Sequence, residues 1–210
     1  MAPVTEVPAG RASRALGTLA VLGAIAVAAG CTEDDSGPLG DDQLPGAIEK
    51  TTSSARGVPT VSSCEAVNRA QENLAISAAQ EEDGYRYWTY RLDDGTWVSV
   101  AVVEPGYPFE DLDRALSSVS DAVDECAGQS SSASGQVAAL EDVPEGAVGF
   151  TSTTTSSNGT REGATVLAPA GDDRIVTVAV SHDAGSDASV DVLEVLDDVQ
   201  DQAADLDLSG

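Results

Sequence analysis

The sequence predicts a single α+β domain over residues 58–207, in which an antiparallel sheet of about five strands is flanked by two or three amphipathic helices. Two observations carry this prediction. Runs of β-branched and aromatic residues are separated by tight-turn sequences, which join neighbouring strands as antiparallel hairpins. Elsewhere, apolar residues recur at intervals of three and four and predict helices with one buried face, which needs a sheet to cover.

The domain begins with a helix between Cys64 and Gln80, because apolar residues of this stretch share one helical face (Val67, Ala70, Leu74 and Ala78). Two strands follow at residues 85–92 and 96–104, joined by the turn sequence Asp93-Asp94-Gly95. Trp88 and Trp97 belong to these strands. We favour a buried aromatic cluster under the sheet over a stacking platform for a ligand.

A second helix is predicted from Pro108 to Cys126, where six residues fall on one face (Phe109, Leu112, Leu116, Val119, Val123 and Cys126). Pro108 suits the first helical position, and Asp111 suits the positive end of the helix dipole. Gly128 follows closely enough to end the helix.

Three strands and a helix complete the domain. Strands at residues 148–156 and 161–168 flank Asn158-Gly159, a strong hairpin signal that also accounts for the glycosylation sequon at Asn158. A third strand, at residues 174–181, follows the turn sequence Gly171-Asp172-Asp173. Ser186 or Asp187 is then expected to cap a final helix that runs to about Leu206.

Residues 1–30 read as a lipoprotein signal peptide. Arg11 and Arg14 supply its positive region, residues 15–29 are almost uncharged, and residues 27–30 place small side chains before Cys31. The run is too short for a typical spanning helix. We therefore expect cleavage before Cys31, diacylglycerol on its thiol, and a mature chain anchored by lipid to the outer face of the cell membrane.

Residues 31–57 are predicted to be a flexible, lipidated tether, because they are rich in Asp, Gly, Ser, Thr and Pro and hold few apolar residues. Sugars on the Ser/Thr-rich segment 51–63 are an open alternative to a plain linker.

Together with this location, the cysteine content predicts one disulfide. With Cys31 consumed by lipid, Cys64 and Cys126 remain as one pair, which outside the cytoplasm predicts a disulfide. The competing interpretation, two thiols that bind a metal or exchange electrons, lacks a CxxC motif and a nearby histidine.

The formal net charge of −26 limits the partners. Lys50 is the only lysine and the arginines are scattered, so no basic stripe is present to neutralise phosphates. We expect no nucleic-acid partner and no electrostatic adhesion to anionic lipid. The carboxylates are spread along the whole chain, which favours a solvated, mutually repelling surface over a cation-binding function.

The segment Asp121 to Gln129, and above all Cys126-Ala127-Gly128-Gln129, resembles the end of the central helix in the PknH-type extracellular sensor domain of mycobacterial receptor kinases and related actinobacterial lipoproteins. The resemblance covers about residues 58–207 and implies an antiparallel sheet flanked by helices around a ligand cleft. It also implies two disulfides, of which only the pair Cys64 and Cys126 has a counterpart here.

Catalytic and metal-binding patterns are missing from the sequence. His182 is the only histidine, it stands beside Asp183 at a predicted strand end, and no nucleophile-elbow motif accompanies it. Zinc would need clustered His and Cys ligands. The two Asp-containing turns offer oxygens for calcium, but turn formation explains them.

We therefore predict no catalytic residues, no cofactor and no metal. The first hypothesis is a non-catalytic module that binds a small ligand or a cell-envelope component in a cleft beside the sheet. The second is an accessory or scaffolding lipoprotein that holds a membrane or envelope protein through a surface patch. A hydrolase acting on wall polymer through an acidic pair is a weaker third.

Overall fold

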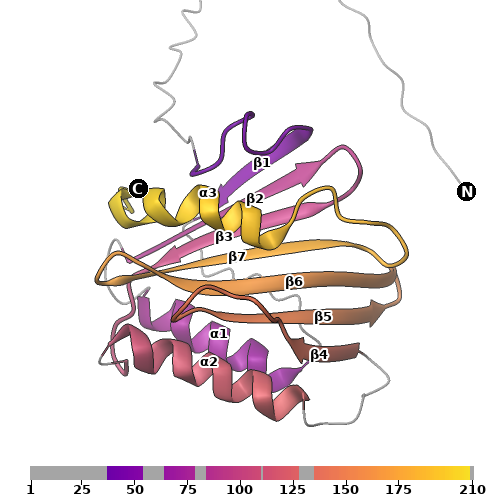
Figure 1. Cartoon of the computed structure of the whole chain (residues 1–210). Coiled ribbons are helices and arrows are strands. Elements are labelled where there is room, and N and C mark those ends of the chain that lie inside the picture. The colour runs from indigo at the N-terminus through magenta and orange to yellow at the C-terminus, as the bar shows by residue number, and fades with distance from the viewer. Residues whose placement is uncertain (1–36, 54–63, 79–83, 110, 128–134, 209–210) are drawn as a thin grey trace, which may run out of the picture. The chain divides into compact units, whose positions relative to one another are not determined.

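The centre of the fold is an antiparallel sheet with helices on both faces (Figure 1). A computed structural model describes residues 37–53, 64–78, 84–109, 111–127 and 135–208. The sheet has seven strands: β1 (Ala47–Ser53), β2 (Tyr85–Leu92), β3 (Trp97–Val103), β4 (Gly135–Ala139), β5 (Val148–Ser156), β6 (Gly159–Ala170) and β7 (Arg174–Asp183). The helices are α1 (Glu65–Ala78), α2 (Leu112–Ala127) and α3 (Val192–Asp205). The predicted α+β class is confirmed.

The strands lie in the order β1-β2-β3-β7-β6-β5-β4, and every neighbouring pair is antiparallel. The five predicted strands are the five at the centre, whereas the two edge strands, β1 and β4, were not predicted. Edge strands need less apolar alternation than central ones, and the sequences AIEKTTS and GQVAA carry almost none.

Alternating side chains divide the core into two layers. On one face, the residues Val98, Val100, Val176, Val178 and Val180 pack with the apolar side of α3. On the other face, Ala101, Val103, Phe150, Leu167 and Ile175 pack with α1 and α2. Because central strands are buried on both faces, β7 reads as a nearly continuous run of apolar residues.

Part of the predicted tether is folded. Residues 47–53 form β1 and pair with β2, so the flexible tether predicted for residues 31–57 is wrong over this stretch. Leu39 and Leu44 are buried on the α3 face, and the backbone N–H of Leu39 donates to the Tyr90 hydroxyl at 3.4 Å. Isolated leucines in a polar segment leave no periodicity, and this is why the composition suggested a linker.

Two helix starts differ from the prediction because carboxylates cap them. Asp111 accepts from the backbone N–H of Arg114 at 2.8 Å, so α2 begins at Leu112 and Pro108 lies in the preceding turn. Asp191 accepts from the backbone N–H of Leu193 at 2.8 Å and caps α3, in place of the predicted Ser186 or Asp187.

The predicted disulfide is present. Cys64 is bonded to Cys126 across 62 residues, with a Cα–Cα distance of 6.1 Å. The bond joins the start of α1 to the end of α2, and this makes the two helices an antiparallel pair.

The predicted aromatic burial holds in part. Trp88 is buried in the α3-face core, whereas Trp97 is half-buried beneath the Arg91 guanidinium, 5.8 Å from the ring centroid. Cys31 and the predicted signal peptide lie outside the described residues. Within the part of the chain that is described, we find no helix with the length and apolar character needed to span a membrane.

Candidate functional site

A cleft of 370 Å³ opens on the α3 face of the sheet, beside the start of α3. We call it the β5–β7 cleft. Its floor comes from alternate residues of three strands, Thr151 and Thr153 of β5, Glu162 and Ala164 of β6, and Val180 and His182 of β7. Its walls come from Leu140 and from the segment that leads into α3, Ala188, Val190, Asp191 and Leu193. Volumes of this order are typical of small-ligand sites.

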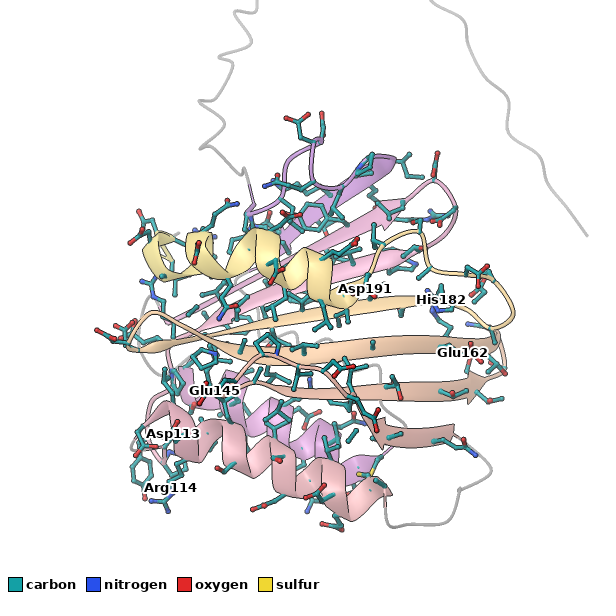
Figure 2. All side chains as sticks on the ribbon, in the orientation of Figure 1. Asp113, Arg114, Glu145, Glu162, His182 and Asp191 are labelled. Atoms are coloured by element: carbon teal, nitrogen blue, oxygen red, sulfur yellow. A yellow bond between two sulfur atoms is a disulfide. The ribbon has the colours of Figure 1, made fainter. Side chains whose placement is uncertain are left out.

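The cleft exists because α3 begins only at Val192 and leaves one end of the sheet uncovered. The helix covers β6 and β7 without reaching the ends of these strands that carry Glu162 and His182. Figure 2 shows Asp191 at the first turn of α3, with His182 and Glu162 toward the same end of the sheet. The sheet surface beyond the helix is therefore open.

Small side chains deepen the centre of the floor. Ala164 pairs with Thr151 on one side and with Val180 on the other. A methyl group at this central position leaves space that a larger residue would fill. The floor is thus apolar at Ala164 and Val180 and carries hydroxyl groups along its β5 edge.

The second wall depends on Gly149. A Cβ atom at this position would lie 2.6 Å from Cγ1 of Val143 and 3.0 Å from Cβ of Leu140. Such distances are too short for carbon atoms, so only glycine lets the segment around residues 140–143 cross β5 this closely. Leu140 reaches the cleft because of that crossing.

The rim is polar and acidic. Glu162 and His182 stand opposite each other on neighbouring strands. The Nδ1 atom of His182 lies 3.2 Å from the Asp183 carbonyl oxygen and 3.5 Å from the Ser186 hydroxyl. Asp191 supplies a second carboxylate, which also caps α3. Among the described residues that line the cleft, none is lysine or arginine.

Ser186, whose hydroxyl lies beside the His182 ring, is not among the residues that line the cleft. The Ser186 hydroxyl donates to the Asp183 carbonyl oxygen at 2.6 Å. No group of three or more His, Cys, Asp or Glu side chains suited to a metal ion occurs within the described ranges. What the cleft offers is shape, an apolar floor and hydrogen-bonding groups at the rim.

Asp94 serves the turn between β2 and β3. Its carboxylate accepts from the backbone N–H of Thr96 at 2.8 Å and from the Thr96 hydroxyl at 3.0 Å. The backbone hydrogen bond is the main reason that the pKa of Asp94 lies below its ordinary value. Turn formation, which the sequence favoured over calcium binding, therefore accounts for this residue.

The residues singled out from the sequence lie elsewhere, with one exception. Cys64 and Cys126 are on the opposite face, at the ends of α1 and α2, and Cys31 lies outside the described residues. His182, expected as a surface residue at a strand end, is half-exposed and lines the cleft. The other lining residues were missed, since their convergence depends on strand register.

Comparison with models of known protein families and with curated proteins gives no match for this chain.

Proposed function

We propose that this protein is an extracytoplasmic lipoprotein that holds a small ligand in the β5–β7 cleft and does not transform it. The observation that carries the proposal is the 370 Å³ cleft, with an apolar floor and a rim of hydrogen-bonding side chains. Few convergent polar groups around an apolar floor are what small-molecule sites require. The resemblance to PknH-type sensor domains, which implies a ligand cleft beside the sheet, also supports the proposal.

The charge of the rim narrows the ligand class. Glu162 and Asp191 carry the formal charges, and the net charge of the whole chain is −26. An anion would meet carboxylates without a lysine or arginine from the lining residues to offset them. The ligand is therefore neutral or cationic, with an apolar portion that fits over Ala164 and Val180.

A cleft-filling substitution tests ligand binding. Ala164→Phe places a ring at the centre of the floor, between Thr151 and Val180. Small molecules extracted from the host's own envelope should raise the melting temperature of the wild-type protein, because a ligand that binds only the folded state stabilises it. The variant should show no such shift.

Two further variants make that result interpretable. Thr154→Ala changes the same strand on the opposite face and should keep the ligand-induced shift. Thr153→Val keeps the volume of the floor but removes a hydroxyl. It should reduce the ligand-induced shift in melting temperature, and it therefore tests the cleft if Ala164→Phe folds poorly. An equal shift in wild type, Ala164→Phe and Thr153→Val would contradict a ligand in this cleft.

Attachment to the membrane is a separate proposal that rests on Cys31. Cys31→Ser in the full chain should abolish labelling by a radioactive fatty acid and prevent the shift to the mature, lipid-modified mass. Cys64→Ser, which replaces a disulfide-bonded cysteine of the folded domain, should leave labelling intact. Labelling that persists in Cys31→Ser would contradict lipid attachment at this residue.

A further inference from the structure

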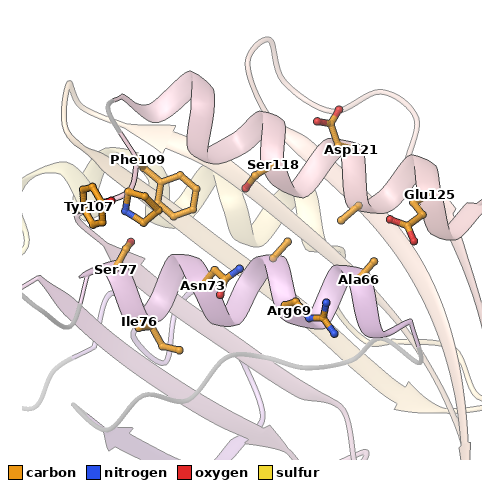
Figure 3. Close-up of a pocket in the computed structure, with 13 residues that line it drawn as sticks. Ala66, Arg69, Asn73, Ile76, Ser77, Tyr107, Phe109, Ser118, Asp121 and Glu125 are labelled. Atoms are coloured by element: carbon orange, nitrogen blue, oxygen red, sulfur yellow. The ribbon is translucent and has the colours of Figure 1, made fainter.

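A second hollow lies on the other face of the sheet, along the outer side of the α1–α2 pair (Figure 3). We call it the α1–α2 groove. It has a volume of 560 Å³ and follows the solvent-facing seam between the two helices. The Cys64–Cys126 disulfide closes one end of the pair and holds the seam together.

Small side chains line the seam. Ala66 and Ala70 face it from α1, and Ser118 and Ala122 face it from α2. Between two packed helices, such residues leave a trough that the side-chain ridge of a third helix can enter. The trough is therefore shaped for a helix laid along the pair.

One end of the groove is apolar and exposed. Tyr107 is 84% exposed and Ile76 is 44% exposed, and Phe109 lies beside Tyr107. The described residues include only three exposed large hydrophobic side chains, and two of them, Tyr107 and Ile76, line this groove. This end offers apolar surface to bulky side chains of a partner.

The other end is acidic. Asp121 and Glu125 stand one turn apart on the exposed side of α2. Arg69 of α1 also lines the groove, and its guanidinium pairs with Glu65 at the start of the same helix. The residues that line the groove thus carry two formal negative charges, on Asp121 and Glu125, and one positive charge, on Arg69.

The two ends are separated by about three helical turns. Ala66 and Ile76 are ten positions apart on α1, and this corresponds to a rise of about 15 Å. A helix lying in the groove would reach both ends if its bulky apolar residues and its basic residues were separated by the same distance.

We propose that the α1–α2 groove docks a basic amphipathic helix of a partner protein. Leucine-like or aromatic side chains of that helix lie against Tyr107 and Phe109, and a lysine or arginine lies opposite Asp121 and Glu125. Helix-in-groove recognition uses this combination of anchors and charge complementarity. An anionic lipid surface is disfavoured because it would be repelled by the same carboxylates.

Site-specific photocrosslinking in the full chain, in the host membrane, tests the proposal. The exposed residue Asn73 lines the groove, and Asn73→p-benzoylphenylalanine should crosslink to one partner segment that carries helix-spaced apolar residues and lysine or arginine. Asp201→p-benzoylphenylalanine, at an exposed position of α3, is the matched control and should not capture that segment.

Variants at the two ends decide whether the capture is specific. Tyr107→Ser, and separately the double change Asp121→Asn with Glu125→Gln, should each lower the crosslinking yield by roughly tenfold, as expected for the loss of an anchor or of complementary charge. Far-UV circular dichroism and an intact disulfide establish that each variant is folded.

Three outcomes would overturn the proposal: crosslinks to lipid or a small molecule only, a captured segment without the apolar and basic pattern, or a yield that neither variant changes. The groove is on the opposite face of the sheet from the β5–β7 cleft. Ala164→Phe should leave the crosslink unchanged, so failure of the groove and failure of the cleft are distinguishable.

Discussion

At the scale of single residues, Asp94 fixes the turn that joins β2 to β3. Two hydrogen bonds from Thr96 stabilise its charged form, the larger effect being that of the backbone N–H, and they lower the pKa of the carboxyl group from its ordinary value of 3.8. Because the folded-state pKa is depressed, this contribution is present above about pH 4 and is lost as the pH falls through the folded-state value.

We predict that Asp94→Asn destabilises the protein at pH 7 and that the difference from wild type narrows at an acid pH well below the ordinary pKa of 3.8. Urea unfolding at both pH values measures this. Asp93→Asn removes a charge from the same turn without removing the Thr96 bonds and serves as the control. Identical behaviour of the two variants at both pH values would show that Asp94 acts through net charge alone.

Tyr90 joins the N-terminal segment to the core. Burial raises the pKa of its phenol to about 12, and the hydroxyl accepts from Leu39. The folded-state pKa lies above the ordinary value of 10.0, so the protonated phenol contributes stability that is complete below pH 10 and is lost between about pH 10 and 12.

Tyr90→Phe should cost about 1 kcal/mol at pH 8, the usual size of one hydrogen bond. Between pH 10 and 12 the wild type should lose its advantage, because the phenylalanine variant has no phenol to ionise. The comparison is made by urea unfolding at pH 8 and pH 11, with the exposed Tyr107→Phe as control. A constant difference across this range would contradict the role of burial.

At the scale of elements, the α1–α2 pair depends on its disulfide. Closing a loop of 62 residues restricts the unfolded chain by about 4 kcal/mol. The double change Cys64→Ser with Cys126→Ser should therefore lower the urea midpoint by a corresponding amount, and reduction of the wild type should have the same effect. If the reduced wild type kept its midpoint, the bond would not constrain this fold.

The C-terminal end of α3 is held by Arg174. One guanidinium nitrogen, Nη1, donates to the carbonyl oxygens of Ala203, Ala204 and Leu206, at 3.2, 3.1 and 2.7 Å. Ala203 and Ala204 belong to the last turn of α3, where carbonyl groups lack an intrahelical partner and carry the negative end of the helix dipole, and Leu206 is the C-cap residue.

Arg174→Met should reduce the free energy of unfolding by about 1–3 kcal/mol, because it leaves these carbonyl groups without the charged donor. Arg174→Lys, which keeps the charge, should recover part of the loss. Thermal unfolding followed by circular dichroism measures both variants. Equal stability of the methionine variant and the wild type would show that Arg174 does not stabilise α3.

Prediction from sequence succeeded where a local pattern determines the element. Helices α1 and α2 were identified from their apolar spacing, and the central strands from β-branched runs and turn residues. It failed at β1 and β4, whose residues become strands only because a neighbouring strand offers free hydrogen-bonding groups. Tertiary partners, which a local pattern does not contain, decide such elements.

The cleft was less predictable than the fold for the same reason. Its floor depends on the pairing of Ala164 with Thr151 and Val180, and its wall depends on the close passage over Gly149. A shift of one residue in the register would turn Ala164 to the other face. His182 was noticed only as the single histidine of the chain.

At the scale of the whole molecule, the net charge of −26 sets a general property of stability. Repulsion among carboxylates opposes the compact state, and salt screens it within a distance of about 10 Å at 0.1 M. Raising NaCl from about 0.02 to about 0.5 M should increase the melting temperature by several degrees, most of it below about 0.2 M. Lower stability at the higher salt would show that attractive ion pairs outweigh repulsion.

The two proposed sites lie on opposite faces of one sheet, and this gives the molecule two independent surfaces. The β5–β7 cleft is bounded by α3, and the α1–α2 groove lies outside the other helix layer. We propose that the chain holds a ligand on one face and a partner helix on the other.

Native mass spectrometry of the full chain, recovered from its own membrane without reduction or denaturation, tests the central claim most directly. The account predicts an additional small mass beyond the lipidated, disulfide-bonded chain, lost on denaturation and missing from Ala164→Phe. A bare chain in the wild type, or the same additional mass in Ala164→Phe, would contradict a ligand in the β5–β7 cleft.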